Sequence, residues 1–329
     1  RIASSLRGEW HPVVVTDSAD RLVVVWDVFD GDSFNVCLRE YDGQAWGKRK
    51  DVAHTPAFEG RPDLVADREA GVWLAGEEGG HRWGQPYRGI RTEVIRDEVG
   101  PLHRFRALRL AYLDATGDIR RLQTPLPMPA MKTGGQRQQL SPGVSQLGVF
   151  YERPRLSLDG CGRPWVFYRH FFTPWLGVAH RSHVQDDWGV YGRCFGAEGW
   201  SSIYRAAIGQ GDGMQRLELT PHASGVHACY TTGRTHRTSN DRPRGLVHAT
   251  FGDDQPRTQH VPVVRDPVTA MGEQPAASSN ARPRVRVGDK DYQVYFGDLH
   301  RHTDLSLCRV PIDGTIDDAY RYAIEVARL

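Results

Sequence analysis

Apolar residues in this chain occur in short runs or in alternation with polar residues, and turn-forming residues separate these stretches. The stretches with the two-residue period or short apolar run of a β-strand are residues 22–26, 72–75, 165–168, 225–230 and 245–251. Turn sequences rich in Gly and Asp, such as DGD, ATGD and DGCG, lie between the strands. The pattern predicts a mainly β protein.

A proline followed five residues later by an aspartate recurs ahead of three of the predicted strands. The pairs are Pro12 and Asp17, Pro62 and Asp67, and Pro154 and Asp159. The first two prolines are 50 residues apart, and 92 residues, close to two such periods, separate the second from the third. Trp46 and Trp200 mark a second shared position, because each lies sixteen residues before the next repeat begins.

A period of about 40 to 50 residues with several strands per repeat is typical of a β-propeller. One blade cannot bury both of its faces alone, whereas blades packed around an axis can. We therefore predict a propeller of roughly six blades over residues 1–265, and a pair of β-sandwiches is the alternative. Residues 84–105 and 125–148 break the pattern and are expected to be long loops, where ligands tend to bind.

Residues 266–289 have the small, polar, Pro-containing composition of a linker, and residues 290–329 form a separate C-terminal segment. The net charge of +2 gives no electrostatic reason to expect nucleic acid or membrane partners. The five cysteines are widely spaced without a C-x-x-C pair, which argues against a disulfide framework or a zinc ribbon. We expect a small-molecule or polymer substrate.

The sequence VYFGDLHRHTDLS at residues 294–306 is the strongest candidate for metal chemistry. In extended backbone, residues two apart point the same way, so His300 and His302 can hold one ion such as Zn, Mn or Fe. Asp298 can fix the tautomer of a ligand imidazole as a second-shell partner. An H-x-H pair is also common as an ordinary solvated surface feature.

This motif, followed by DGTIDDAYRYAIEVA, resembles the opening of PHP (polymerase and histidinol phosphatase) domains, and in particular an uncharacterised PHP-type family. The resemblance covers roughly residues 290–329. It implies a (β/α)7 barrel whose bound metal ions activate water to hydrolyse phosphate esters. His300 and His302 match the ligands of the first strand. Cys308 stands where such domains often have an Asp or His ligand, so its role as a ligand stays open beside that of a small buried Cys.

The helix of this segment is expected to begin near Thr315, a good N-cap. Its predicted apolar stripe is Ile316, Ala319, Tyr320, Ala323 and Ala327. Asp317 and Asp318 are interpreted as charges of the first turn, favoured by the helix dipole. Since the resemblance places further ligands beyond residue 329, we expect the chain to be a fragment cut at both ends, with a truncated barrel that is inactive alone.

Two further groups are candidates for ligand binding. Trp175 belongs to an aromatic run that can stack on sugars, although an aromatic core is the alternative interpretation. Arg234 and Arg237 can clamp an anion, with a solvated arginine-rich loop as the alternative.

The sequence thus supports three functional hypotheses. The first is part of a metal-dependent phosphoesterase that carries a recognition propeller. The second is a non-catalytic propeller that binds a glycan, polymer or protein. The third is a sialidase-like or lyase-like propeller enzyme.

Overall fold

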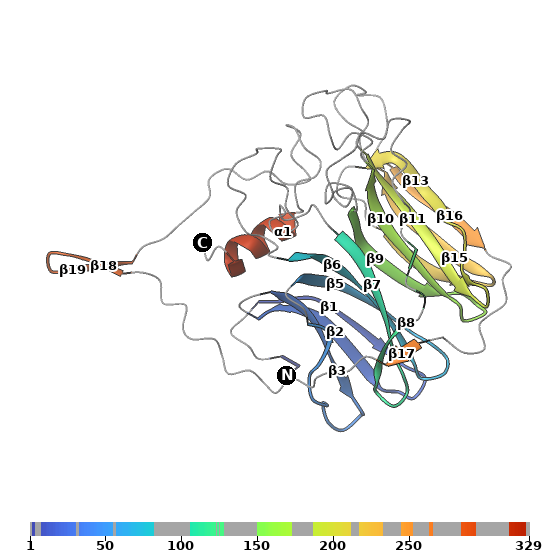
Figure 1. Ribbon diagram of the computed structural model, residues 1–329, viewed down its shortest axis with the longest axis horizontal. Helices are drawn as coiled ribbons and strands as arrows, with labels where there is room; N and C mark the ends of the chain where they lie inside the picture. Colours follow the sequence, from blue (N-terminus) through green and yellow to red (C-terminus); the bar gives the residue numbers. More distant parts are fainter. Residues whose placement is uncertain are drawn as a thin grey trace.

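A computed structural model gives the structure of the protein. It describes residues 2–3, 8–30, 33–54, 57–81, 106–122, 124, 126–127, 150–172, 187–211, 217–232, 245–252, 263–265, 284–293 and 316–326. These residues are mainly β, with antiparallel sheets that do not close on themselves, and each strand predicted above is present (Figure 1). Within this part of the chain, no helix is both long and apolar enough to cross a lipid bilayer.

The first sheet is an antiparallel meander in chain order. Its strands are β1 (Glu9–Thr16), β2 (Leu22–Phe29), β3 (Phe34–Tyr41) and β4 (Lys50–Ala53). The next four strands repeat this order: β5 (Ala57–Ala66), β6 (Val72–His81), β7 (Arg106–Leu113) and β8 (Ile119–Leu122). The short strand β17 (Val263–Arg265) pairs with the edge of β8.

The third group consists of β9 (Phe150–Leu158), β10 (Pro164–Phe172), β11 (Asp187–Gly196), β12 (Gly199–Trp200) and β13 (Tyr204–Gly211). A single parallel bridge between Arg106 and Phe150 joins it to the second group. The fourth sheet consists of β14 (Leu217–His222), β15 (Gly225–Thr232) and β16 (Gly245–Gly252). The hairpin β18 (Arg284–Val287) and β19 (Lys290–Gln293) is exposed and stands apart from the four groups (Figure 1).

Consecutive sheets pack face to face, and their first strands β1, β5, β9 and β14 are neighbours. On β6, Leu74 packs toward the first sheet while Trp73 packs toward the third. On β10, Tyr168 packs toward the second sheet while Trp165 packs toward the fourth. The middle sheets thus bury both faces, which is consistent with a propeller-like arrangement. The aromatic run at residues 165–168 is core, with Trp165, Phe167 and Tyr168 fully buried.

The three repeat prolines occupy equivalent positions, as the sequence predicts. The residue before each proline has a left-handed backbone, with φ of 47° at His11, 47° at Arg61 and 51° at Arg153. The pairing of the first strand with the second shifts register at each of these points. An extra residue at the same place in each first strand therefore forms a β-bulge.

The aspartates of the repeat organise the turn at the other end of each first strand. In each turn, one carboxylate oxygen accepts the backbone N–H groups two and four residues later, at 2.8–2.9 Å. Asp114 forms the same turn between β7 and β8, although no proline precedes it. The position three residues after the aspartate is left-handed in all four turns: Asp20, Ala70, Gly117 and Gly162.

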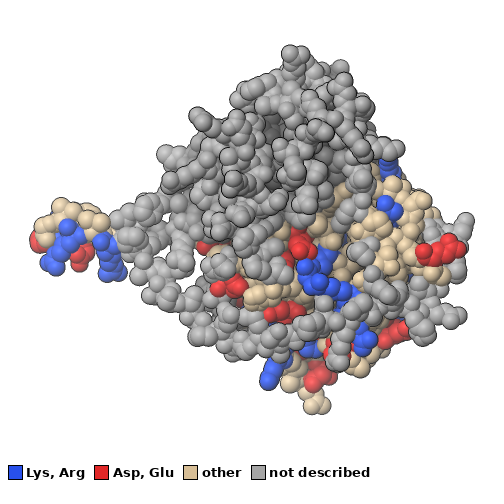
Figure 2. Space-filling view, in the orientation of Figure 1, with Lys and Arg blue, Asp and Glu red and all other residues tan. Residues whose placement is uncertain are grey.

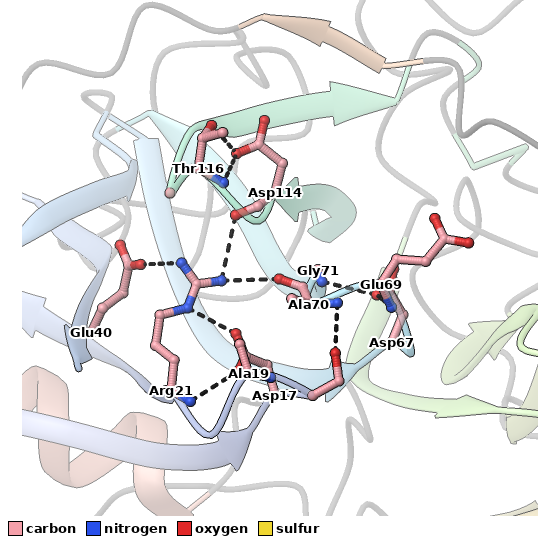
Figure 3. Close-up of polar contacts among 12 residues, drawn as sticks. Asp17, Ala19, Arg21, Glu40, Asp67, Glu69, Ala70, Gly71, Asp114 and Thr116 are labelled. Atoms are coloured by element: carbon pink, nitrogen blue, oxygen red, sulfur yellow. Dashed lines mark hydrogen bonds and ion pairs between the residues drawn. The ribbon is translucent and has the colours of Figure 1, made fainter. Parts of the chain in front are cut away.

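Arginine side chains tie these turns together across neighbouring sheets. Arg21 Nη2 donates to Ala70 O at 3.0 Å (Figure 3), and Arg163 Nη2 donates to Ser224 O at 2.9 Å. Arg68 Nη2 donates to Gly160 O at 2.9 Å. Each contact joins the turn of one sheet to the turn of the next, so this end of the stack is fixed by local structural contacts.

Candidate functional site: a buried charge cluster

Charged side chains gather at the bulge end of the strands, opposite the tied turns. Ten residues after each turn aspartate, the second strand carries Asp27, Glu77 or Arg169, and each of these pairs across the sheet with the start of the first strand. We call the following group the charge cluster: His11, Asp27, Arg61, Glu77, Glu152, Arg169, Asp318 and Arg321. All of them except His11 are at most 7% exposed.

Asp27 on β2 is a carboxylate of the cluster that contacts groups from three other elements. Its Oδ1 lies 3.1 Å from His11 Nδ1, and its Oδ2 lies 2.5 Å from Arg321 Nη2. The backbone N of Arg61 also donates to Oδ2, at 3.4 Å. Burial raises the pKa of Asp27, but Arg321 and the bond to His11 outweigh burial and hold this pKa below its ordinary value. Asp27 is therefore a carboxylate at neutral pH.

Glu77 on β6 repeats this role one sheet further on. Its Oε1 accepts the backbone N–H of Arg153 at 2.7 Å, just as Asp27 accepts the N–H of Arg61. Both donors are bulge residues in the first strand of the following sheet. These bonds satisfy N–H groups that the bulges remove from the sheet ladder.

Arg61 lies between the carboxylates of two different segments. Its Nη1 is 2.8 Å from Glu77 Oε2, and its Nη2 is 2.6 Å from Asp318 Oδ1. Burial lowers the pKa of Arg61, but Asp318 and Glu77 together raise it well above the ordinary value. The guanidinium is therefore permanently charged.

The third sheet places an arginine where the first two sheets place a carboxylate. Arg169 donates to Glu152 Oε2 through Nε at 3.1 Å and through Nη2 at 2.6 Å, and both side chains are buried. Glu152 also lies close enough to contribute to the raised pKa of Arg61. Side chains from three sheets thus form one electrostatic group.

The C-terminal helix completes the cluster. Helix α1 (Ile316–Arg321) continues into the π-helical segment η2 (Tyr322–Val326), and its Asp318 and Arg321 are fully buried. The Arg321 guanidinium lies 4.1 Å from the ring centre of Phe34 and 5.5 Å from that of Phe58. Burial lowers the pKa of Arg321, and Asp27 offsets this effect only in part.

The start of the helix at Ile316 agrees with the prediction, and Asp317 and Asp318 lie in its first turn as expected. Asp318 is in addition a buried ion-pair partner of Arg61. Of the predicted apolar stripe, Ile316 is 41% and Tyr320 62% exposed, Ala319 and Ala323 are half-buried, and Ala327 lies outside the described residues. The carboxylate of Asp318 pairs with Arg61 and the guanidinium of Arg321 pairs with Asp27, so this face of the helix packs inward.

Asp63 on β5 adds a titratable group between the second and third sheets. Its Oδ2 accepts the backbone N–H of Leu156 at 2.7 Å, and Arg155 Nη1 lies 3.6 Å from its Oδ1. Burial raises the pKa of Asp63 to about 6, against the smaller lowering effects of Arg155 and the N–H bond. Its charge state therefore changes at mildly acidic pH.

The predicted site residues fall elsewhere. The metal candidates His300, His302 and Cys308, with Asp298, lie outside the described residues. Trp175, Arg234 and Arg237 also lie outside them. These assignments stay predictions. Among the residues that the structure does describe, no three His, Cys, Asp or Glu side chains are grouped as metal ligands.

The sequence carries a signal for the cluster that is separate from the predicted motifs. Asp27, Glu77 and Arg169 are charges within apolar strands, and all three stand at the same distance from the turn aspartate. His11, Arg61 and Arg153 each precede a repeat proline. An alignment of the repeats places the three strand charges at one position and the three residues before the prolines at another.

Comparisons with known proteins show no match to any family model and no match among curated proteins. Solved structures do align with the chain. A PL25 polysaccharide lyase, an ulvan lyase, aligns over 78% of this chain and 55% of its own, with 11% identity and a TM-score of 0.47. The sialidase Hz136 from a Hadza microbial source aligns over 76% and 47%, with 13% identity and a TM-score of 0.43. An arabinoxylan arabinofuranohydrolase of glycoside hydrolase family 43 from Bacillus subtilis aligns over 80% and 52%, with 11% identity and a TM-score of 0.40. The chain spans about half the length of these three proteins.

The assignment to the PHP superfamily, and with it the phosphoesterase prediction, is corrected. No family model matches, and the aligned structures are a polysaccharide lyase, a sialidase and a glycoside hydrolase. The described residues contain no PHP barrel. The resemblance rested on about an eighth of the chain, and the helix within that segment packs through Asp318 and Arg321 on antiparallel sheets rather than along a parallel barrel strand.

Proposed function

We propose that the chain is part of a β-propeller that binds and acts on an acidic polysaccharide, with the charge cluster as its carbohydrate site. The propeller is supported by first strands that lie side by side, by bulges and turns at equivalent positions, and by middle sheets buried on both faces. The observation that carries the functional proposal is Arg61, a buried guanidinium on a left-handed bulge that binds carboxylates from two separate segments.

The cluster differs from the charged contacts at the turn end. There, Arg21 binds Asp17 of its own turn, Glu40 of the neighbouring strand β3 and the backbone of the next turn. Arg163 binds Asp159 of its own turn and the backbone of the next turn. Neither arginine contacts the C-terminal helix in the described residues, and we interpret both as structural ties between turns. At the bulge end, charges from three sheets and a helix converge in one buried group. A buried ion pair contributes little net stability, whereas convergent groups with perturbed pKa values are typical of functional sites.

Arginine is suited to an acidic sugar because its planar guanidinium binds a carboxylate through two parallel hydrogen bonds. On the described part of the face that Figure 2 draws, Lys and Arg lie beside Asp and Glu. We therefore assign recognition of the acidic sugar to Arg61.

His11 supplies a candidate base. Its side chain is 27% exposed, and Asp27 at 3.1 Å holds Nδ1, which leaves Nε2 available to accept a proton. With the carboxylate of a uronate bound at Arg61, His11 would remove the ring proton next to that carboxylate and leave a carbanion. The electron pair of the carbanion forms the carbon–carbon double bond as the bond to the leaving sugar oxygen breaks. The leaving oxygen takes a proton from water, and the resulting hydroxide takes the proton from His11. This reaction is a β-elimination, and it needs no partner besides the polymer and water.

The test compares polygalacturonate with its methyl ester, a matched polymer in which the carboxylates are blocked. We expect the protein to bind the free acid at least about tenfold more tightly and to form the ultraviolet-absorbing unsaturated uronate. His11→Asn should abolish the product while retaining binding. Equal binding of the two polymers would contradict the proposal. Binding of the acid without any product would instead support the non-catalytic binding module.

A further inference from the structure

Helix α1 docks in an unusual orientation. A helix that packs on a protein for stability normally buries an apolar stripe. Here Asp318 and Arg321 point inward, while Ile316, Tyr320 and Ile324 are 41%, 62% and 53% exposed. Its contact with Asp27 joins positions 294 residues apart in the chain. The most deeply buried side chains of the helix are therefore its charged ones.

Asp318 occupies the place that a ligand carboxylate needs. Glu77 takes one terminal nitrogen of Arg61, and Asp318 takes the other at 2.6 Å. Glu77 is anchored to the sheets through the backbone of Arg153. Asp318 belongs to the short C-terminal helix, so it is the partner of Arg61 that can be replaced while the sheets remain intact.

Arg321 lies next to this ion pair, and only part of its guanidinium is hydrogen-bonded. It lies over Phe34, with Phe58 and Trp10 each 5.5 Å from the guanidinium carbon, and it bonds to Asp27. Its Nε and Nη1 are buried and have no hydrogen-bond partner among the residues that the structure describes. Unpaired buried donors weaken this packing. Aromatic rings beside a carboxylate suit a sugar, whose apolar face stacks on a ring while its hydroxyls donate to the carboxylate.

We infer that helix α1 is an internal occupant of the carbohydrate site, and that an acidic sugar displaces it by placing a carboxylate on Arg61 and a neighbouring sugar over Phe34. This inference rests on the proposed function. It makes the helix a competitor whose removal exposes two adjoining subsites, one for a carboxylate and one aromatic.

The test uses the full chain with Asp318→Asn, and with Asp317→Asn as a matched control. Both changes remove one negative charge from the same turn of the helix, but Asp317 is exposed. We expect Asp318→Asn to bind polygalacturonate about tenfold more tightly than the wild type, and Asp317→Asn to bind like the wild type. Affinity that is unchanged or reduced in Asp318→Asn relative to Asp317→Asn overturns the inference.

Hydrogen exchange of residues 316–326 provides a readout that does not depend on affinity. Polygalacturonate should speed exchange of these amides in the wild type, and Arg61→Gln should speed it without any polymer. If Arg61→Gln leaves exchange unchanged, the helix is not held by Arg61 and the inference fails while the proposed function stands. If no variant binds polymer although Arg61→Gln releases the helix, the proposed function fails. The inference that the helix competes with a sugar for the site then fails as well.

Discussion

Ala70 and Gly162 occupy the same position in two copies of one turn, three residues after the aspartate. Their φ angles are 58° and 80°, in the left-handed region that costs an L-residue about 1 kcal/mol relative to glycine. Ala70 carries this cost, whereas Gly162 avoids it.

We predict that Ala70→Gly raises the free energy of unfolding by about 0.5–1 kcal/mol and that Gly162→Ala lowers it by at least about 1 kcal/mol. Urea unfolding of the two variants and the wild type measures both effects. A loss of stability in Ala70→Gly would show that the methyl group is needed for packing and that the turns are not equivalent.

Asp63 gives the protein a pH dependence whose sign can be stated. Its pKa is raised from 3.8 to about 6, so the folded state binds the proton more tightly than the unfolded chain does. The stability from this proton is present below pH 3.8 and is lost as the pH rises through about 6.

Asp63→Asn keeps an oxygen for the N–H of Leu156 but removes the buried charge. We predict that it raises the free energy of unfolding at about pH 8 by roughly 1–3 kcal/mol and has little effect near pH 4. Unfolding curves at the two pH values test this. A variant less stable than the wild type at the higher pH would mean that the ion pair with Arg155 outweighs desolvation.

At the residue scale, contacts between residues a few positions apart could be predicted from the sequence, whereas contacts between distant segments could not. The Asp17, Asp67 and Asp159 turns followed from the Pro-to-Asp spacing. The turn after Asp114 was predicted from ATGD at residues 115–118, but its equivalence to the other three was not, because no proline precedes it. Arg61 was missed because its partners Glu77 and Asp318 come from other elements. Nothing local to Arg61 indicates that it is buried.

Among the elements, the Asp turn appears in a buried and in an exposed setting. Asp159 and Arg163 form a pair that is almost completely inaccessible, and Asp159 also accepts Trp165 Nε1 at 3.1 Å. Asp114 forms the same turn with a side chain 16% exposed, and its partner Arg120 is 35% exposed. The backbone geometry is shared, but the surroundings are not.

We predict that Asp159→Ala lowers the free energy of unfolding by about 3–5 kcal/mol, because it leaves Arg163 buried and unpaired. Asp114→Ala should lower it by only about 1–2 kcal/mol, the value of a lost cap-like hydrogen-bond set. Chemical denaturation of both variants provides the comparison. Equal losses would show that the turn, rather than the buried pair, dominates.

Strands were predictable because their two-residue period depends on neighbours in sequence. The buried faces at residues 22–26 and 165–168 follow directly from the apolar pattern. The orientation of helix α1 did not follow from its apolar stripe, since Ile316 and Tyr320 are exposed while Asp318 and Arg321 are buried. The sequence pattern of the helix cannot show that its charged residues pair with Asp27 and Arg61, which come from distant strands.

For the whole molecule, the two ends of the sheet stack carry different kinds of charged contact. The turn end joins neighbouring sheets through arginines that bind the aspartate of their own turn and a backbone carbonyl of the next turn, as Arg163 does with Asp159 and Ser224 O. The bulge end brings Arg61 together with groups from separate sheets and from helix α1. We propose that the turn end stabilises the fold and that the bulge end binds ligand.

The most direct test of this division is the dissociation constant for polygalacturonate in Arg61→Gln and Arg163→Gln. Both substitutions remove a buried guanidinium that is paired with a carboxylate, and both should lower stability. Isothermal titration calorimetry under conditions where both variants are folded should show binding weakened at least about tenfold by Arg61→Gln and changed less than about twofold by Arg163→Gln. Equal affinities in the two variants would contradict the assignment of the charge cluster as the carbohydrate site.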